Sequence, residues 1–320
     1  MYPSYLESYH EGQLNKLIEE TYGMLKSCCI CPRRCGVNRL KDEKGFCKTG
    51  LKPKVYSHLP HHGEEPPISA TQGSGTIFFS HCNMGCVYCQ NYESSQLGQG
   101  REVELDELAA SMLELQGLGC HNINLVTPTH VLPQILKALD IAISQGLKVP
   151  LVYNTGGYEL AETIKLLEGI IDIYLPDMRY GDSEMAARYS CAPDYPRYNQ
   201  EALKEMHRQV GIAKVDNSGI IIQGVIVRHL VLPGGVSGTD KIMQFIATRI
   251  SKETYISLMS QYAPYYKASQ FKEISRRITY KEYKEAQAGM SKYGLHNGWM
   301  QESRGEERFA GVNIKPSISP

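Results

Sequence analysis

The amino-acid sequence predicts an α/β fold in which helices cover a largely parallel β-sheet. Six short apolar stretches alternate with helical stretches between residues 75 and 294. The apolar stretches are almost uninterrupted, which is typical of strands that are covered on both faces. The chain has 320 residues, of which 42% are hydrophobic, enough to build the core of one such domain. Parallel connections are right-handed, so the sheet is expected to form a barrel, a partial barrel or a doubly wound sheet.

The predicted strands are short and rich in β-branched and aromatic residues, beginning with GTIFFS and ending with TYISLM. They cover residues 75–80, 123–126, 149–154, 171–175, 219–232 and 254–259. The predicted helices repeat apolar residues every three or four positions, as Leu105, Leu108 and Met112 do. They cover residues 11–26, 104–117, 131–144, 158–169, 183–190, 199–211, 239–250 and 280–294. In barrels and in doubly wound sheets alike, active sites lie beyond the C-terminal ends of the strands.

Charge and composition argue against two classes of partner. Lys and Arg number 34 and so do Asp and Glu, so the overall charge does not indicate nucleic-acid or membrane-surface binding. The N-terminus lacks a basic region followed by an apolar stretch, and no apolar run approaches the length of about 18 residues that a membrane helix needs. We therefore expect a cytoplasmic protein.

The ten cysteines are concentrated in two groups, which indicates metal binding in a chain of this size rather than a disulfide framework. Cys82, Cys86 and Cys89 form a C-x3-C-x2-C array just after the first predicted strand. Thiolates are the usual ligands of iron–sulfur clusters, and a 4Fe–4S cluster normally takes four. Three ligands would leave one iron open to a cofactor or substrate. The alternatives are a structural zinc knuckle and three unrelated core cysteines.

The other group is Cys28, Cys31, Cys35 and Cys47, with the spacing C-x2-C-x3-C-x11-C. Four thiolates suffice for a tetrahedral zinc ion or for a closed iron–sulfur cluster. A metal would brace a short segment that cannot bury much core of its own. The alternative is a reduced cluster of thiols without metal.

The C-x3-C-x2-C array, with the aromatic Tyr88 just before its last cysteine, resembles the signature of radical S-adenosylmethionine (SAM) enzymes. The resemblance implies that the open iron is chelated by the amino and carboxylate groups of SAM. It further implies that one electron from the reduced cluster cleaves SAM, and that the resulting 5′-deoxyadenosyl radical abstracts hydrogen from substrate.

A longer stretch, residues 28–262, is similar to the pyruvate formate-lyase activating enzyme-like group. It resembles a branch with an N-terminal CxxCPRxC segment, a GEEPP loop at 63–67 and LVTPTH at 125–130. This resemblance implies a TIM-like partial (β/α)6 barrel, open on one side toward a large substrate. It implies three segments: an N-terminal helix and Cys-rich part (1–70), the radical SAM barrel (71–270) and a C-terminal helical extension (271–320).

The resemblance also implies a set of cofactor-binding residues at the strand ends. The Gly-Gly-Glu that meets the SAM amino group in the family is absent, and Thr127, Thr129 and His130 occupy its place. The pair Asp177 and Arg179 matches the activases' Asp-x-Lys. The remaining matches are Asn154 after the third strand, Tyr88, and Arg228, which looks like the arginine that contacts SAM. Several have an alternative from the residues alone: Thr127 or Thr129 can cap a helix, Asn154 can make a turn, and Asp177 with Arg179 can be a solvated ion pair.

These observations favour a radical SAM enzyme that acts on a glycyl-radical enzyme, another protein or peptide, or a small molecule. The resemblance implies a flavodoxin or ferredoxin as reductant. One competing hypothesis is an iron–sulfur electron-transfer or sensor protein without turnover. Another is a zinc-stabilised nucleic-acid binder, which the balanced charge disfavours.

Overall fold

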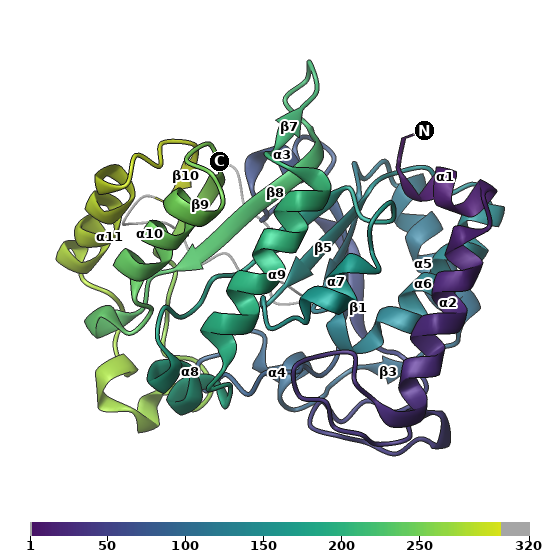
Figure 1. The fold of residues 1–320 in the computed structure, drawn as a ribbon, viewed down its shortest axis with the longest axis horizontal. Helices are drawn as coiled ribbons and strands as arrows, with labels where there is room; N and C mark the ends of the chain where they lie inside the picture. The colour runs from purple at the N-terminus through teal and green to yellow at the C-terminus, as the bar shows by residue number, and fades with distance from the viewer. Residues whose placement is uncertain (1, 302–320) are drawn as a thin grey trace, which may run out of the picture.

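The computed structural model of the chain describes residues 2–301, in which one extended β-sheet is flanked by helices (Figure 1). The order of the strands is β10-β9-β8-β6-β5-β4-β2-β1-β3, and β7 pairs with β8 outside this path. Every neighbouring pair from β2 to β10 is parallel. The pairs of β1 with β2, of β3 with β1 and of β7 with β8 are antiparallel.

The strands, in chain order, are β1 (Lys54–His61), β2 (Ser74–Phe79), β3 (Arg101–Glu102), β4 (Ile123–Val126), β5 (Leu151–Thr155), β6 (Ile173–Pro176), β7 (Lys214–Val215), β8 (Ile221–Leu230), β9 (Tyr255–Met259) and β10 (Gly298–Met300). The α-helices are α1 (Tyr5–His10), α2 (Gln13–Gly23), α3 (Pro66–Ser69), α4 (Tyr92–Ser95), α5 (Leu105–Gly117), α6 (Leu132–Ser144), α7 (Ala161–Lys165), α8 (Ser183–Ser190), α9 (Tyr195–Val210), α10 (Thr239–Arg249) and α11 (Tyr280–Lys292).

The α/β fold with a parallel sheet is confirmed, and all six predicted strands occur as parallel neighbours in chain order. The count of six is not confirmed, because β10 adds a seventh parallel strand within the described residues. The sequence analysis also missed β1, which has two histidines and Pro60 within eight residues and therefore shows no apolar alternation. The division of the chain into three segments stays a prediction, and residues 302–320 of its last segment lie outside the described residues.

Two predicted helices differ from the structure for local reasons. The helix expected at 11–26 starts after Gly12, which has a positive φ of 70° and separates α2 from α1. The helix expected at 158–169 is reduced to α7, and residues 158–160 before it have no regular secondary structure, with Leu160 extended. There the Glu159 carboxylate accepts hydrogen bonds from the hydroxyls of Thr129 and Thr155, which holds this residue away from helical geometry.

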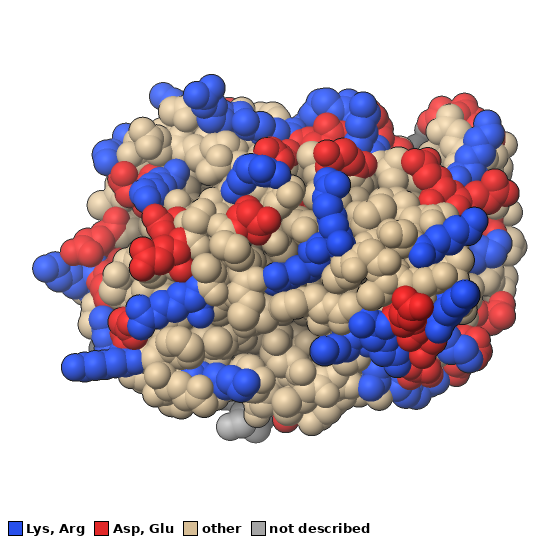
Figure 2. All heavy atoms as spheres, turned by 60° about the horizontal axis from the view of Figure 1, so that its bottom comes forward, with Lys and Arg blue, Asp and Glu red and all other residues tan. Residues whose placement is uncertain are grey.

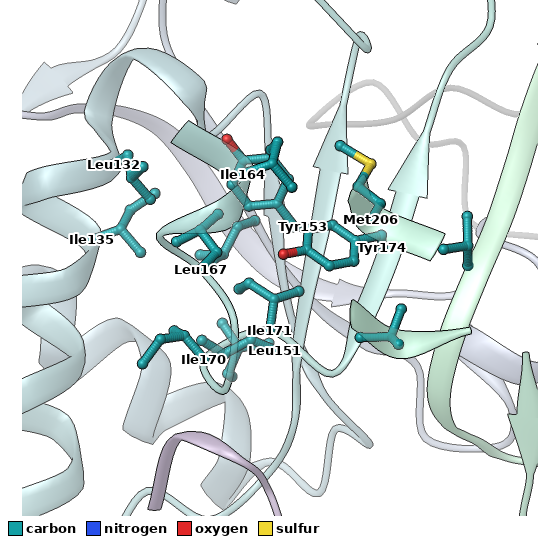
Figure 3. Close-up of a cluster of buried hydrophobic side chains, with 14 of the residues drawn as sticks. Leu132, Ile135, Leu151, Tyr153, Ile164, Leu167, Ile170, Ile171, Tyr174 and Met206 are labelled. Carbon is teal, nitrogen blue, oxygen red and sulfur yellow. The ribbon is translucent and has the colours of Figure 1, made fainter. Parts of the chain in front are cut away.

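The core lies between the sheet and the helices. Figure 3 shows Tyr153 of β5 and Tyr174 of β6 pointing to the same side as side chains of α6, α7 and α9. The two tyrosine rings meet edge to face with centroids 5.9 Å apart. None of the helices within residues 2–301 is long and apolar enough to cross a membrane.

Alternate residues of the same strands point to the opposite face of the sheet. Val152, Ile173, Leu175 and Ile226 form a smaller apolar cluster there with Ile68 of α3. Because side chains alternate along a strand, the next inward-facing positions toward the C-terminal ends of the strands belong to polar residues. These positions contain the candidate site.

Candidate functional site

Polar side chains lie beside the apolar cluster around Val152 and Ile226, most of them toward the C-terminal ends of neighbouring parallel strands. Asn154 lies in β5, Arg228 in β8 and Asp177 directly after β6, whereas Asn124 lies near the start of β4, level with Val152. Asp177 and Arg228 face each other across an isolated parallel bridge, in which the Met178 amide donates to the Arg228 carbonyl at 2.8 Å. The strand alternation that buries the core therefore also brings these four residues together.

Glu64, in the loop between β1 and α3, reaches into this group of residues. One of its carboxylate oxygens, Oε1, accepts hydrogen bonds from Asn124 at 3.0 Å and from Asn154 at 3.3 Å. The other, Oε2, lies 3.2 Å from a guanidinium nitrogen of Arg228. Burial raises the pKa of Glu64, although the positive charge of Arg228 acts in the opposite direction.

Asp177 is the centre of the charge network. Its Oδ1 accepts a hydrogen bond from Arg228 Nε at 3.0 Å, and its Oδ2 accepts two from Arg179, at 2.7 and 3.1 Å. Burial acts to raise the pKa of Asp177, but the guanidiniums of Arg228 and Arg179 outweigh it and hold the pKa below its ordinary value. Asp177 is therefore ionised, and Arg228 is also bonded through Nη2 to Asn154 at 2.9 Å. The solvated ion pair considered from the sequence is thus a buried network.

The loop after β2 contains the cysteine array, and hydrogen-bond donors point at its sulfurs. Cys86 is 3% exposed, and its Sγ accepts from the Ser190 hydroxyl at 2.9 Å and from Arg179 Nη1 at 3.3 Å. The Sγ of Cys82 accepts from the Met84 amide at 3.4 Å. Donors of this kind stabilise thiolates, and they suit cluster sulfurs, whose charge is tuned by such hydrogen bonds.

Burial favours the protonated, uncharged form of two thiols in the same loop. Burial raises the pKa of the Cys82 thiol to about 12 and also raises that of Cys89. A coordinated metal would deprotonate such thiols outright. Within residues 2–301, no three His, Cys, Asp or Glu side chains converge on a single metal ion. That arrangement is not required by a cluster in which each thiolate binds a different iron.

A cavity connects the cysteine loop with the charge network. Five of the predicted cofactor-binding residues line it: Tyr88, Asn154, Asp177, Arg179 and Arg228. Cys89 and Glu64 line it as well. The rest of its wall is mixed: it includes the amides of Gln90, Asn91 and Gln261, the rings of Tyr262 and Tyr265, and the apolar side chains of Val126, Leu230, Met259 and Ala263.

The structure does not bring Thr127, Thr129 and His130 to this cavity. Thr129 is buried and donates to Glu159 at 2.5 Å, and His130 is buried and donates from Nε2 to the Ser80 carbonyl at 2.8 Å. Thr127 is half-buried with a φ of 60°, and it does not line the cavity either. The sequence places all three after β4, but it does not show that Thr129 and His130 are bonded to Glu159 and Ser80 instead.

Burial gives His130 a defined effect on the pH dependence of stability. It lowers the pKa of the His130 ring to about 3 from an ordinary value of 6.5. The unfolded chain then binds a proton between these pH values that the folded chain does not, so this residue reduces stability as the pH falls from 6.5 toward 3. Between pH 6.5 and pH 4, the free energy of unfolding should therefore fall more in wild type than in His130→Gln, by on the order of 2–3 kcal/mol.

This expectation is checked by urea unfolding at both pH values. His296→Gln, at an exposed histidine, serves as the matched control and should follow wild type. Equal pH slopes for the His130 variant and wild type would show that His130 is not held neutral by burial.

The N-terminal cysteines lie in a segment that is docked on α7 and on the cysteine loop. Thr163 of α7 donates to the Ile30 carbonyl at 2.8 Å, and Arg33 Nε donates to the Asn83 carbonyl at 2.9 Å. Cys28, Cys31 and Cys47 are buried and Cys35 is half-buried. Burial raises the pKa of Cys31, and the nearby Cys47 and Cys28 act in the same direction. Cys28 and Cys47 are therefore near Cys31, but no three of the four side chains are grouped around one point among residues 2–301, so a metal at this site stays a prediction.

The sequence analysis missed Glu64 and Asn124 as individual site residues. The GEEPP loop was noted as a motif, but its chemistry depends on the antiparallel strand β1, which places the loop over the ends of β4 and β5. Asn124 is an inward-facing polar residue in an otherwise apolar strand, and that signal was available in the INLV stretch.

Comparison with known proteins identifies relatives of this chain. The family model of the radical SAM superfamily matches residues 76–246. An uncharacterised protein of Methanocaldococcus jannaschii is 33% identical over 300 residues, which are 91% of this chain and 82% of that protein. The residues matched by the family model run from β2 into α10 and include the cysteine loop, Asp177 and Arg228.

Two solved structures are similar at low sequence identity. A radical SAM methyltransferase from Sphaerobacter thermophilus is 16% identical with a TM-score of 0.48, over 72% of this chain and 67% of that one. HydG, a maturase of the FeFe-hydrogenase, is 15% identical with a TM-score of 0.45, over 68% of this chain. The match covers 49% of HydG, so it spans about half of that protein.

Proposed function

We propose, given that this chain belongs to the radical SAM superfamily, that it is an enzyme that abstracts hydrogen from a protein or peptide substrate. Membership in the superfamily implies a 4Fe–4S cluster and SAM. The observation that carries the proposal is the cavity in which Cys89 faces the network of Glu64, Asp177, Arg179 and Arg228. When bound, the cluster and SAM supply a one-electron cleavage and a carbon radical that removes hydrogen from substrate.

Cys82, Cys86 and Cys89 would hold the cluster. The donors that point at two of these sulfurs fit that role, since they stabilise thiolate charge. Arg179 has a double function in this account. It holds Asp177 through Nε and Nη2, and through Nη1 it neutralises part of the charge on Cys86.

Glu64 and Asp177 are the groups that suit the SAM amino group. Carboxylates accept charge-assisted hydrogen bonds from ammonium groups. Glu64 lines the cavity, whereas Thr129 and His130 do not. Arg228 and Arg179 each direct three nitrogens at protein partners and keep further N–H groups for a carboxylate. Glu64 thus takes the place of the family's missing glutamate, although it comes from the β1–α3 loop.

Glu64→Gln is expected to weaken the binding of SAM by about 10- to 100-fold, the value of one charge-assisted hydrogen bond. The readouts are the equilibrium dissociation constant for SAM and the change in the cluster's electron paramagnetic resonance (EPR) signal when SAM is added. Glu65→Gln is the matched control, because Glu65 is equally buried but does not line the cavity. Equal affinity for SAM in wild type and Glu64→Gln would contradict this role.

A protein or peptide target is supported by the activase-like motifs and by the side-chain amides in the wall of the cavity. Side-chain amides such as Gln90, Asn91 and Gln261 both donate and accept hydrogen bonds, as a peptide backbone does. The test uses glycine-containing peptides deuterated at Cα and measures deuterium in 5′-deoxyadenosine by mass spectrometry. Transfer of deuterium supports the target class, and its absence from every peptide, with transfer from a small molecule instead, contradicts it.

We also propose that Cys28, Cys31, Cys35 and Cys47 bind zinc or a second iron–sulfur cluster. Three of the four are buried, and the segment that contains them is hydrogen-bonded to α7 and to the cysteine loop, which supports a bracing role. Metal analysis of a Cys31→Ser variant distinguishes the two metals, since it should lose either zinc or part of the iron. The expected reductant is a flavodoxin or ferredoxin, and the expected compartment is the cytoplasm.

A further inference from the structure

The segment that contains the N-terminal cysteines is strongly basic although the chain as a whole is neutral. Residues 26–54 include nine Lys and Arg and two acidic residues, which gives this segment a net charge of +7. Six of the basic side chains are exposed, and we call them the basic N-terminal surface: Lys26, Arg34, Lys41, Lys44, Lys48 and Lys52. The remaining basic residues are half-buried or, for Arg39, buried.

Most of this charge is not neutralised by neighbouring residues. Lys44 lies 3.5 Å from Asp42, and Lys52 pairs with Glu104. The other four side chains have no carboxylate within 4.0 Å among residues 2–301. Figure 2 brings the bottom of Figure 1, where the N-terminal loop lies, toward the viewer, and Lys and Arg side chains gather around a few acidic ones at its lower right. Such a surface attracts acidic partners and accelerates their association.

The basic N-terminal surface is attached directly to the cysteine loop. Arg33 donates from Nε to the Asn83 carbonyl at 2.9 Å and from Nη1 to the Cys191 carbonyl at 2.6 Å. Its guanidinium also lies 3.7 Å from the centre of the Phe46 ring, and the edge of this ring packs against Gly85. Asn83 and Gly85 lie between Cys82 and Cys86, so the segment contacts the loop that would hold the cluster.

Two apolar side chains are exposed among these charges. Phe46 is 38% and Leu51 is 37% exposed, and both lie within the same segment. Exposed apolar residues inside a charged rim are typical of protein interfaces, in which a few buried anchors supply most of the binding energy.

We propose that the basic N-terminal surface docks a small acidic electron-transfer protein, which passes one electron to the cluster held by Cys82, Cys86 and Cys89. This inference rests on the proposed function, because only a reductively activated cluster needs such a donor. The transfer forms and breaks no bond: the donor is oxidised by one electron and the cluster is reduced by one. Charge complementarity brings the donor to the surface, and Phe46 and Leu51 contact it.

A nucleic acid fits this surface less well. Proteins that bind single strands combine basic grooves with aromatic side chains on which bases stack. Phe46 is the one aromatic residue among residues 26–54, and Arg33 covers a face of its ring. The balance of charges and apolar side chains therefore favours an acidic protein.

The test compares two variants that carry the same change in charge. Lys41→Glu with Lys44→Glu alters the basic N-terminal surface, and Lys281→Glu with Lys284→Glu alters α11 at the opposite side of the molecule in Figure 1. The probe is reduced flavodoxin. Its binding is measured at low and high salt, and its transfer of an electron is followed by bleaching of the cluster's visible absorbance. Dithionite-driven formation of 5′-deoxyadenosine is measured in parallel.

We expect the Lys41 and Lys44 double variant to lose about 10-fold or more in the rate of reduction by flavodoxin at low salt. Wild type should lose a similar factor at high salt. The α11 double variant should match wild type, and dithionite should support equal product formation in all three proteins. Equal flavodoxin rates in both double variants would overturn the proposal, as would tighter binding of an RNA oligonucleotide than of flavodoxin to the same surface. Silence of wild type with dithionite, with flavodoxin binding intact, would instead refute the proposed function.

Discussion

Replacing Cys86 with alanine is expected to abolish iron binding at the cysteine loop. Cys86 is the most buried of the three cysteines, and the donors Arg179 and Ser190 point at its sulfur. The variant has two thiolates left in the loop, too few to retain a 4Fe–4S cluster. After anaerobic reconstitution, iron content and the EPR signal of the reduced cluster measure the loss. The signal should fall below detection.

The control for this experiment is Cys120→Ala. Cys120 is also a buried thiol, but it belongs to the main core and lies outside both cysteine groups. This variant should keep the EPR signal of wild type with a modest loss of stability from the missing sulfur. An unchanged cluster signal in Cys86→Ala would contradict the assignment of the cysteine loop.

The second large effect is expected at Arg228. Its guanidinium is bonded to the carboxylates of Asp177 and Glu64. These two residues are 7% and 9% exposed. Arg228→Leu would leave Asp177 as a buried charge with Arg179 as its remaining partner, and Glu64 with only amides. Removing one partner of a buried ion pair lowers the free energy of unfolding by about 3–5 kcal/mol. Urea unfolding of the metal-free protein measures this change.

Two further variants make this prediction specific. Arg208→Leu removes an exposed arginine that pairs with Glu168 and Glu205, and it should have a much smaller effect. The double variant Arg228→Leu with Glu64→Gln should recover part of the lost stability, because it removes the unpaired charge along with its partner. A double variant less stable than the single one by the full effect of Glu64→Gln would show that the two residues do not interact.

The parts of the fold that follow from local pattern could be predicted from the sequence. The apolar runs of β4, β5 and β6 have no competing interpretation, and the spacing of Cys82, Cys86 and Cys89 is specific to its chemistry. Asp177 and Arg228 were also found, because charged residues at the ends of apolar strands are unusual unless they serve a site. For these residues, position along the strand decides position in the fold.

The parts that depend on long-range contacts could not be predicted in the same way. Glu64 reaches the site through the pairing of β1 with β2. Thr129 does not, because its hydroxyl donates a hydrogen bond to Glu159, 30 residues later. His130 is drawn to the carbonyl of Ser80, 50 residues earlier. None of these partners is visible from spacing alone. The same holds for Arg33, which connects the N-terminal segment to Asn83.

The central claim is that this chain cleaves SAM with a cluster held by Cys82, Cys86 and Cys89. The most direct test is to reconstitute the wild-type protein anaerobically, reduce it with dithionite in the presence of SAM, and measure 5′-deoxyadenosine by mass spectrometry. Our account predicts that wild type forms 5′-deoxyadenosine and that Cys86→Ala does not. Wild-type protein that contains the reduced 4Fe–4S cluster and binds SAM, yet forms no 5′-deoxyadenosine, would contradict it and favour an electron-transfer role.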